Sequence, residues 1–129
     1  MTLARGPFDV KRAPLPAYAT DPAFGRMSLD KVFEGDLIGT SAGEMLAVGS
    51  AVQGSAAYVA LERVTGALHG RRGSFALHHI GVMTRGAGQL AVGVVPDSGT
   101  DELVGLTGAM KIEVVDGKHL YEFDYQLPG

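Results

Sequence analysis

Glycine residues at short intervals are the feature that most constrains the fold of this chain. There are 19 of them in 129 residues, against roughly 7% in average proteins. They separate segments in which apolar and polar residues alternate, a period typical of β-strands. Only Ala17–Phe24 and Asp101–Val104 have room for a turn or so of helix. The alternation predicts eight strands, at Phe8–Arg12, Met27–Glu34, Leu37–Val48, Ala56–His69, Gly73–Met83, Gln89–Val95, Ala109–Val114 and His119–Gln126.

The connections between these predicted strands are short, and most contain glycine, as in Gly35-Asp36 and Asp116-Gly117. Strands joined in this way pair with their neighbours in sequence and form an antiparallel meander. Without helices to cover a sheet, the strands remove their edges by closing on themselves. We therefore expect an all-β fold, a closed eight-stranded antiparallel meander barrel. One domain spans residues 1–129, and residues 1–25 supply an N-terminal strand and an irregular proline-containing segment.

Composition excludes several classes of protein. The formal net charge is −3, whereas a nucleic-acid-binding module would carry a basic stripe. The chain has no cysteine, so disulfides and thiolate chemistry are absent and a reducing cytoplasm is permitted. No apolar run approaches the roughly 18 residues of a membrane-spanning helix. We expect a cytoplasmic protein with no nucleic-acid or membrane partner and no cofactor.

The alternation also assigns side chains to the two faces of each strand. In the last strand Tyr121, Phe123 and Tyr125 share the apolar face. The strands between Leu37 and Met83 are apolar on both faces, which predicts that their outer face is covered by a loop or by a second subunit. We expect a homodimer with these strands in the interface. Inside the barrel the aromatic side chains would fill space, whereas glycines would leave it, at positions 39, 43, 66 and 81.

A register argument brings Glu62 and His79 together. If Arg71-Arg72 is a two-residue hairpin loop, Glu62 faces Gly81, Val64 faces His79, and Phe75 and Leu77 share their side. Any even loop length preserves this facing. Glu62 and His79 are then diagonal neighbours inside an apolar barrel. Such a pair can act as an acid–base pair, or it can be a buried structural pair.

Three further residues are candidates for binding a ligand. Tyr58 lies on the Glu62 face and would add a phenolic donor. Ser41 and Glu44 have opposite parity on their strand, so at most one of them points inward, and the sequence leaves this choice open. A metal site is not predicted, because His78 and His79 are adjacent on a strand and face opposite sides. The Pro96–Gly108 segment is interpreted as a structural crossing, with Leu103 and Leu106 plugging the core.

Four blocks between residues 33 and 108 carry a resemblance to a known family. They read FEGDLxGxSxGE (33–44), LERVTGxLxG (61–70), GSFxLxH (73–79) and VVPxSGTxELxGLxG (94–108). On these blocks the chain resembles an uncharacterised bacterial family described only as a domain of unknown function. The resemblance implies a closed eight-stranded barrel similar in architecture to plant allene oxide cyclase and dirigent proteins. Those barrels guide cyclisation or coupling of reactive intermediates in an apolar cavity, and the analogy is one of fold alone.

The sequence therefore leaves the function unknown and two hypotheses open. The first is a small-molecule-binding barrel, isomerase-like or cyclase-like by fold analogy, with Glu62 and His79 as its polar contacts in an apolar cavity. The second is a non-catalytic structural or interaction module whose barrel is filled by its own side chains. Eight strands enclose an interior just wide enough for either. Whether the chain is an enzyme stays open.

Overall fold

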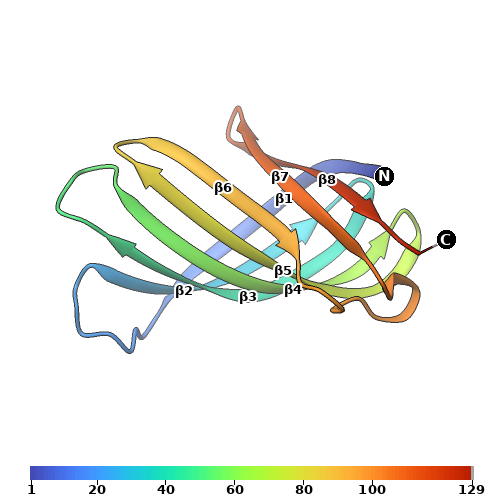
Figure 1. Cartoon of the computed structure of the whole chain (residues 1–129), viewed down its shortest axis with the longest axis horizontal. Helices are drawn as coiled ribbons and strands as arrows, with labels where there is room; N and C mark the ends of the chain where they lie inside the picture. The colour runs from blue at the N-terminus through green and yellow to red at the C-terminus, as the bar shows by residue number, and fades with distance from the viewer. Residues whose placement is uncertain (129) are drawn as a thin grey trace.

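The alternating segments form eight strands that follow one another around a closed antiparallel barrel (Figure 1). The computed structural model describes residues 1–128. The strands are β1 (Thr2–Leu15), β2 (Phe24–Phe33), β3 (Leu37–Gly49), β4 (Ala56–Leu68), β5 (Arg71–Thr84), β6 (Ala87–Val94), β7 (Thr107–Val115) and β8 (Lys118–Gln126). Closure comes from Thr2–Phe8 of β1, which pairs with β8. The predicted all-β barrel and its eight strands are thus confirmed.

One end of the barrel is packed solid, and we call it the closed end. The β2–β3 and β4–β5 turns, the β6–β7 connection and both termini lie there (Figure 1). The aromatic face predicted for the last strand points inward, and the rings of Phe75 and Phe123 stack with centroids 5.8 Å apart. Leu103, in a 3-10 turn (η1, Asp101–Leu103), and Leu106 are buried against this core. The Pro96–Gly108 segment is therefore the plug that the sequence predicted, whereas Ala17–Phe24 contains no helix.

The opposite end is looser, and we call it the open end. It carries the β1–β2, β3–β4 and β5–β6 connections (Figure 1). The ladder between β6 and β7 is only two pairs long, Val92 with Met110 and Gly93 with Ala109. Beyond it Ala87–Ala91 pairs only with β5, and Lys111–Val115 pairs only with β8. The wall is therefore unpaired on one side of the open end, and we call this the β6–β7 gap.

The observed β4–β5 turn lies two residues earlier than predicted, which moves each cross-strand partner by four positions. The hairpin loop is His69-Gly70, not Arg71-Arg72, so Leu68 faces Arg71 and Glu62 faces Leu77. His69 and Gly70 adopt positive φ angles of 46° and 81°, as the two central residues of a type I′ turn do. Because the error is an even number of positions, every side chain keeps its predicted face. Glu62 and His79 remain diagonal neighbours.

The inward-facing glycines do not leave free space, contrary to the prediction. A Cβ on Gly39 would lie 2.3 Å from the Thr65 carbonyl oxygen, and one on Gly66 would lie 2.1 Å from that of Ile38. The strands approach each other closely at these points, and neighbouring backbone occupies the room that a side chain would need. At Gly81 the ring of Tyr58 occupies it, 2.2 Å from the position of a Cβ. The free space inside this barrel therefore does not come from its glycines.

Candidate functional site

Four polar side chains meet inside the barrel, midway between its two ends. Glu62 of β4 is their centre, and its side chain is 0% exposed. Its Oε2 lies 2.8 Å from Lys31 Nζ and 2.5 Å from His79 Nε2, and its Oε1 accepts a hydrogen bond of 2.7 Å from the Ser41 hydroxyl. We call Lys31, Ser41, Glu62 and His79 the central cluster. The carboxylate of Glu62 thus has a polar partner on both oxygens.

Strand register places the central cluster along a diagonal across β2, β3, β4 and β5. Lys31 faces Ser41 directly, Gly43 faces Glu62, and Ala60 faces His79. Gly43 is needed for this arrangement, because a Cβ there would lie 2.6 Å from the Glu62 Cα. The ammonium group of Lys31 also lies over the ring of Phe8, 5.0 Å from its centroid, a favourable cation–π arrangement.

His79 is in close contact with Glu62, but the contact lacks the geometry of a regular hydrogen bond. Nε2 is buried, and within residues 1–128 it has no hydrogen bond with acceptable angles, although Glu62 Oε2 lies 2.5 Å away. The short separation holds the ring against the carboxylate. Glu62 therefore orients His79, which also lines the cavity described below.

Burial and the surrounding polar groups act on the Glu62 carboxyl in opposite directions. Burial raises its pKa, but the contact with His79, the charge and hydrogen bond of Lys31, and the hydroxyl of Ser41 together outweigh burial. The pKa of Glu62 falls from 4.5 to about 2. Glu62 is therefore an anion at neutral pH, and Lys31 is its counter-ion. Replacing such a pair with apolar residues can be neutral, whereas removing one partner is costly.

A cavity of about 260 Å³ extends from the central cluster toward the open end. Lys31 and His79 form part of its lining, together with apolar side chains such as Leu29 and Met45. Leu90 and Val114, on either side of the β6–β7 gap, also line it and are exposed. The cavity is thus the open-end part of the barrel interior, lined by all eight strands and bordered by the β6–β7 gap. Glu62 lies behind the cavity and does not line it.

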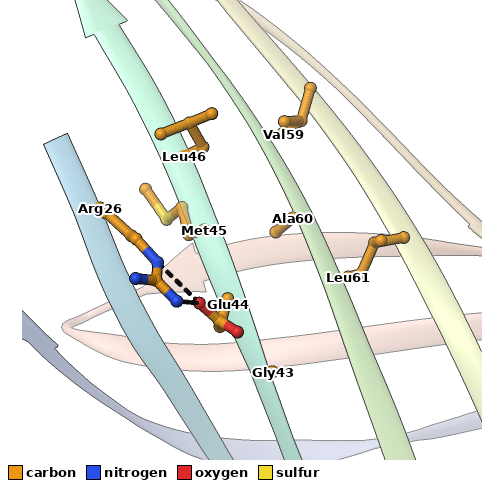
Figure 2. Close-up of a pocket in the computed structure, with 8 residues that line it drawn as sticks. All are labelled: Arg26, Gly43, Glu44, Met45, Leu46, Val59, Ala60 and Leu61. Atoms are coloured by element: carbon orange, nitrogen blue, oxygen red, sulfur yellow. Dashed lines mark hydrogen bonds and ion pairs between the residues drawn. The ribbon is translucent and has the colours of Figure 1, made fainter. Parts of the chain in front are cut away.

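The predicted binding residues divide between the inside and the outside of the barrel. Ser41 points inward and bonds Glu62, which answers the question that its strand parity left open. Glu44 points outward, where Arg26 Nε donates a 2.8 Å hydrogen bond to its Oε1 (Figure 2), so its assignment to the interior site is wrong. Tyr58 is half-buried in the cavity lining. Burial raises its pKa, the charge of Arg12 lowers it, and the charge of Glu62 raises it.

Three basic residues of the site were missed by the sequence argument. Lys31 shares the inner face of β2 with Leu29 and Phe33, and its alternation with them was a usable signal. Arg12 and His119 line the cavity from β1 and β8. Their parity also placed them inside, but nothing in the sequence shows that a cavity reaches them. Within residues 1–128, no group of three or more His, Asp or Glu side chains is arranged to hold a metal ion.

The fold and the site define a small meander barrel that is half filled by its own core and half open around a buried carboxylate. The chain belongs to a family described as proteins of unknown function (DUF3224), whose model matches residues 4–125. A crystal structure of a DUF3224 protein of unknown function from Shewanella oneidensis MR-1, solved at 1.84 Å resolution, is similar to it. The two are 51% identical with a TM-score of 0.96, covering 100% of this chain and 98% of the other.

A comparison with curated proteins found no match. The function of the family is unknown, so neither comparison assigns an activity. Within residues 1–128, no helix is long and apolar enough to cross a membrane.

Proposed function

We propose that the open end binds a small, largely apolar molecule, and that His79, oriented by Glu62, is a polar group that meets it. The observation that supports this proposal is the 260 Å³ cavity with Lys31 and His79 in its lining. Ligand sites are typically concave, mainly apolar and supplied with a few placed polar groups. This volume is below the usual 300–1,000 Å³ of such sites, which favours a small ligand.

The geometry of His79 supports acid–base chemistry as a second candidate function. The Glu62 carboxylate, 2.5 Å from Nε2, fixes the orientation of the ring, and His79 lines the cavity. A ring held in this way can give or take a proton at a bound molecule. The isomerase-like or cyclase-like role and the likeness to allene oxide cyclase rest on fold analogy alone. The cytoplasm remains the proposed location, because a chain without cysteine suits a reducing compartment.

Filling the cavity with a tryptophan tests the binding proposal. A metabolite library is screened by thermal shift against wild type and Val114→Trp, whose new ring would occupy the space between β6 and β7. A ligand at 100 times its Kd adds about 2.7 kcal/mol to stability, which raises the Tm of a domain of this size by about 10 °C. We expect such a shift for wild type and none for Val114→Trp.

Val115→Trp is the matched control for that screen, because Val115 is the next residue of β7 and faces outward. It should respond like wild type. His79→Gln should weaken the shift without removing the cavity. A library in which no compound stabilises wild type, or in which Val114→Trp responds equally, contradicts the proposal.

We also propose that the chain is a homodimer through the outer side of β3, β4 and β5. A row of exposed apolar residues crosses the three strands there, with Leu46 beside Val59 and Val59 beside Ile80. Leu46, Val59 and Leu61 line a hollow on this face, and Arg26 and Glu44 neutralise each other beside it (Figure 2). A two-fold axis would set this patch against itself, with no like charges opposed. A covering loop, the other outcome that the sequence allowed, is absent from residues 1–128, because these side chains are exposed.

A charge placed in this apolar patch should separate the dimer. Sedimentation velocity of wild type is expected to show a dimer, and Val59→Lys a monomer, because the lysine would be desolvated in the interface. Thr65→Lys, at the far end of the same outer face of β4, should remain dimeric. A wild-type protein that is monomeric at every concentration up to about 100 μM would overturn the proposal, since an interface of standard size supports tighter association.

A further inference from the structure

The cavity at the open end carries more positive than negative charge. Four side chains of its lining are cationic or can become so, Arg12, Lys31, His79 and His119, and no aspartate or glutamate lines it. The only carboxylate of the central cluster, Glu62, already pairs with Lys31 at 2.8 Å. Arg12 has no carboxylate within 4.0 Å among residues 1–128. A positive excess inside a chain whose net charge is −3 favours an anionic ligand.

A second hollow continues the cavity along β4, β5 and β6, and its lining is almost wholly apolar. It has a volume of about 360 Å³ and shares Met45, Tyr58 and Leu90 with the first. Its other lining residues are small or apolar, apart from Gln89: Ala47, Ala56, Ala57, Gly81, Val82, Met83 and Gly88. Tyr58 stands where the two parts meet, its ring held against Gly81. The two hollows adjoin at these shared residues, and we call them together the groove, with a basic part and an apolar part.

We propose that this groove binds an anionic amphiphile, a molecule with one carboxylate at the end of an unbranched apolar chain. The inference rests on the proposed function, because it assumes that the open end is a ligand site. The carboxylate would lie against Arg12, whose planar guanidinium can bond it through two parallel N–H groups. The Tyr58 phenol, which lines the same cavity as Arg12, supplies a further donor. The chain would lie along the apolar part.

Three ligands with the same ten-carbon chain separate charge from apolar contact. Decanoate, decan-1-ol and decyltrimethylammonium are titrated at pH 8, below their micelle concentrations, and binding is followed by calorimetry. We expect decanoate to bind wild type about tenfold more tightly than decan-1-ol, because charge-assisted hydrogen bonds exceed neutral ones. The preference should decrease as salt is added, since Arg12 is exposed. Decyltrimethylammonium should bind most weakly.

Two glutamine variants on the same strand assign that preference to the groove. Arg12→Gln should bring decanoate and decan-1-ol to within about twofold of each other. Lys11→Gln removes the same charge from the outer face of β1 and should retain the wild-type preference. Equal binding of the acid and the alcohol, with both lost in Val114→Trp, overturns this inference and leaves the binding site in place. Failure of all three probes overturns the inference, and the metabolite screen then decides the binding proposal separately.

Discussion

Replacing Lys31 with methionine is expected to lower the free energy of unfolding by about 3–5 kcal/mol at pH 7. The methionine fills most of the space of the lysine stem, so the loss comes from charge. It leaves the Glu62 carboxylate, whose side chain is 0% exposed, without its counter-ion. Equilibrium urea unfolding of the two proteins measures the difference. Lys11→Met, an exposed lysine on the outer face of β1, should change stability by less than about 0.5 kcal/mol.

A double variant distinguishes the loss of the ion pair from the loss of packing. Lys31→Met combined with Glu62→Gln removes both charges, while the amide can still accept a hydrogen bond from Ser41. Its loss of stability should be smaller than that of Lys31→Met alone, because no uncompensated charge remains buried. If the two losses simply add, the ion pair is not the origin of the effect.

Acid is expected to remove about 3 kcal/mol of stability from wild type through Glu62 alone. The pKa of this carboxyl is about 2 in the folded chain, below its ordinary value of 4.5. A group whose pKa is lowered by folding stabilises the folded state fully above the unfolded pKa. That stabilisation disappears as the pH falls through the folded value. The loss attributable to Glu62 should therefore fall between about pH 4.5 and pH 2.

The pH effect is isolated by comparing variants, because other carboxyl groups titrate in the same range. Urea unfolding of wild type and Glu62→Gln is measured at several pH values from 5 to 2.5. The wild-type curve should fall more steeply, and the two should converge in acid. Glu44→Gln removes an exposed carboxyl from the other face of the barrel wall and serves as the comparison for the loss of a single carboxyl. Parallel curves for wild type and Glu62→Gln would show that the pKa of Glu62 is not lowered in the folded chain.

The alternation of apolar and polar residues made the fold predictable from sequence. It also assigned the strand faces correctly although the β4–β5 turn was misplaced. The hairpin loop was placed at Arg71-Arg72, whereas the positive φ angles lie at His69 and Gly70. A type I′ turn favours glycine at its second central position, so Gly70 was the better signal. Because strand faces depend only on parity, Glu62 and His79 were still predicted on the inner side. The sequence argument did not predict which residues of β4 and β5 lie opposite each other, because that pairing depends on the exact position of the turn.

The residues of the candidate site were predictable only where strand parity alone decides whether a side chain points into the barrel. Lys31 was within reach of the same argument, since a lysine between Leu29 and Phe33 on an inner face requires a buried partner. The choice between Ser41 and Glu44 depended on the β3–β4 loop, whose sequence permits more than one length. The cavity was beyond sequence reasoning, because strand parity shows neither the short β6–β7 ladder beside it nor the close strand approach that fills the space at the glycines.

The eight strands close into a barrel, but the short β6–β7 ladder leaves two free strand edges beside the gap. Backbone groups of Ala87–Ala91 and Lys111–Val115 have no ladder partner across the gap. Such rows are templates on which another chain can add a strand. Lys111 and Glu113 place charges on the β7 edge, a common protection against this, whereas the β6 segment Ala87–Ala91 has no charged residue. Aggregation of this protein by strand addition would therefore begin at β6, away from the proposed dimer patch on β3, β4 and β5.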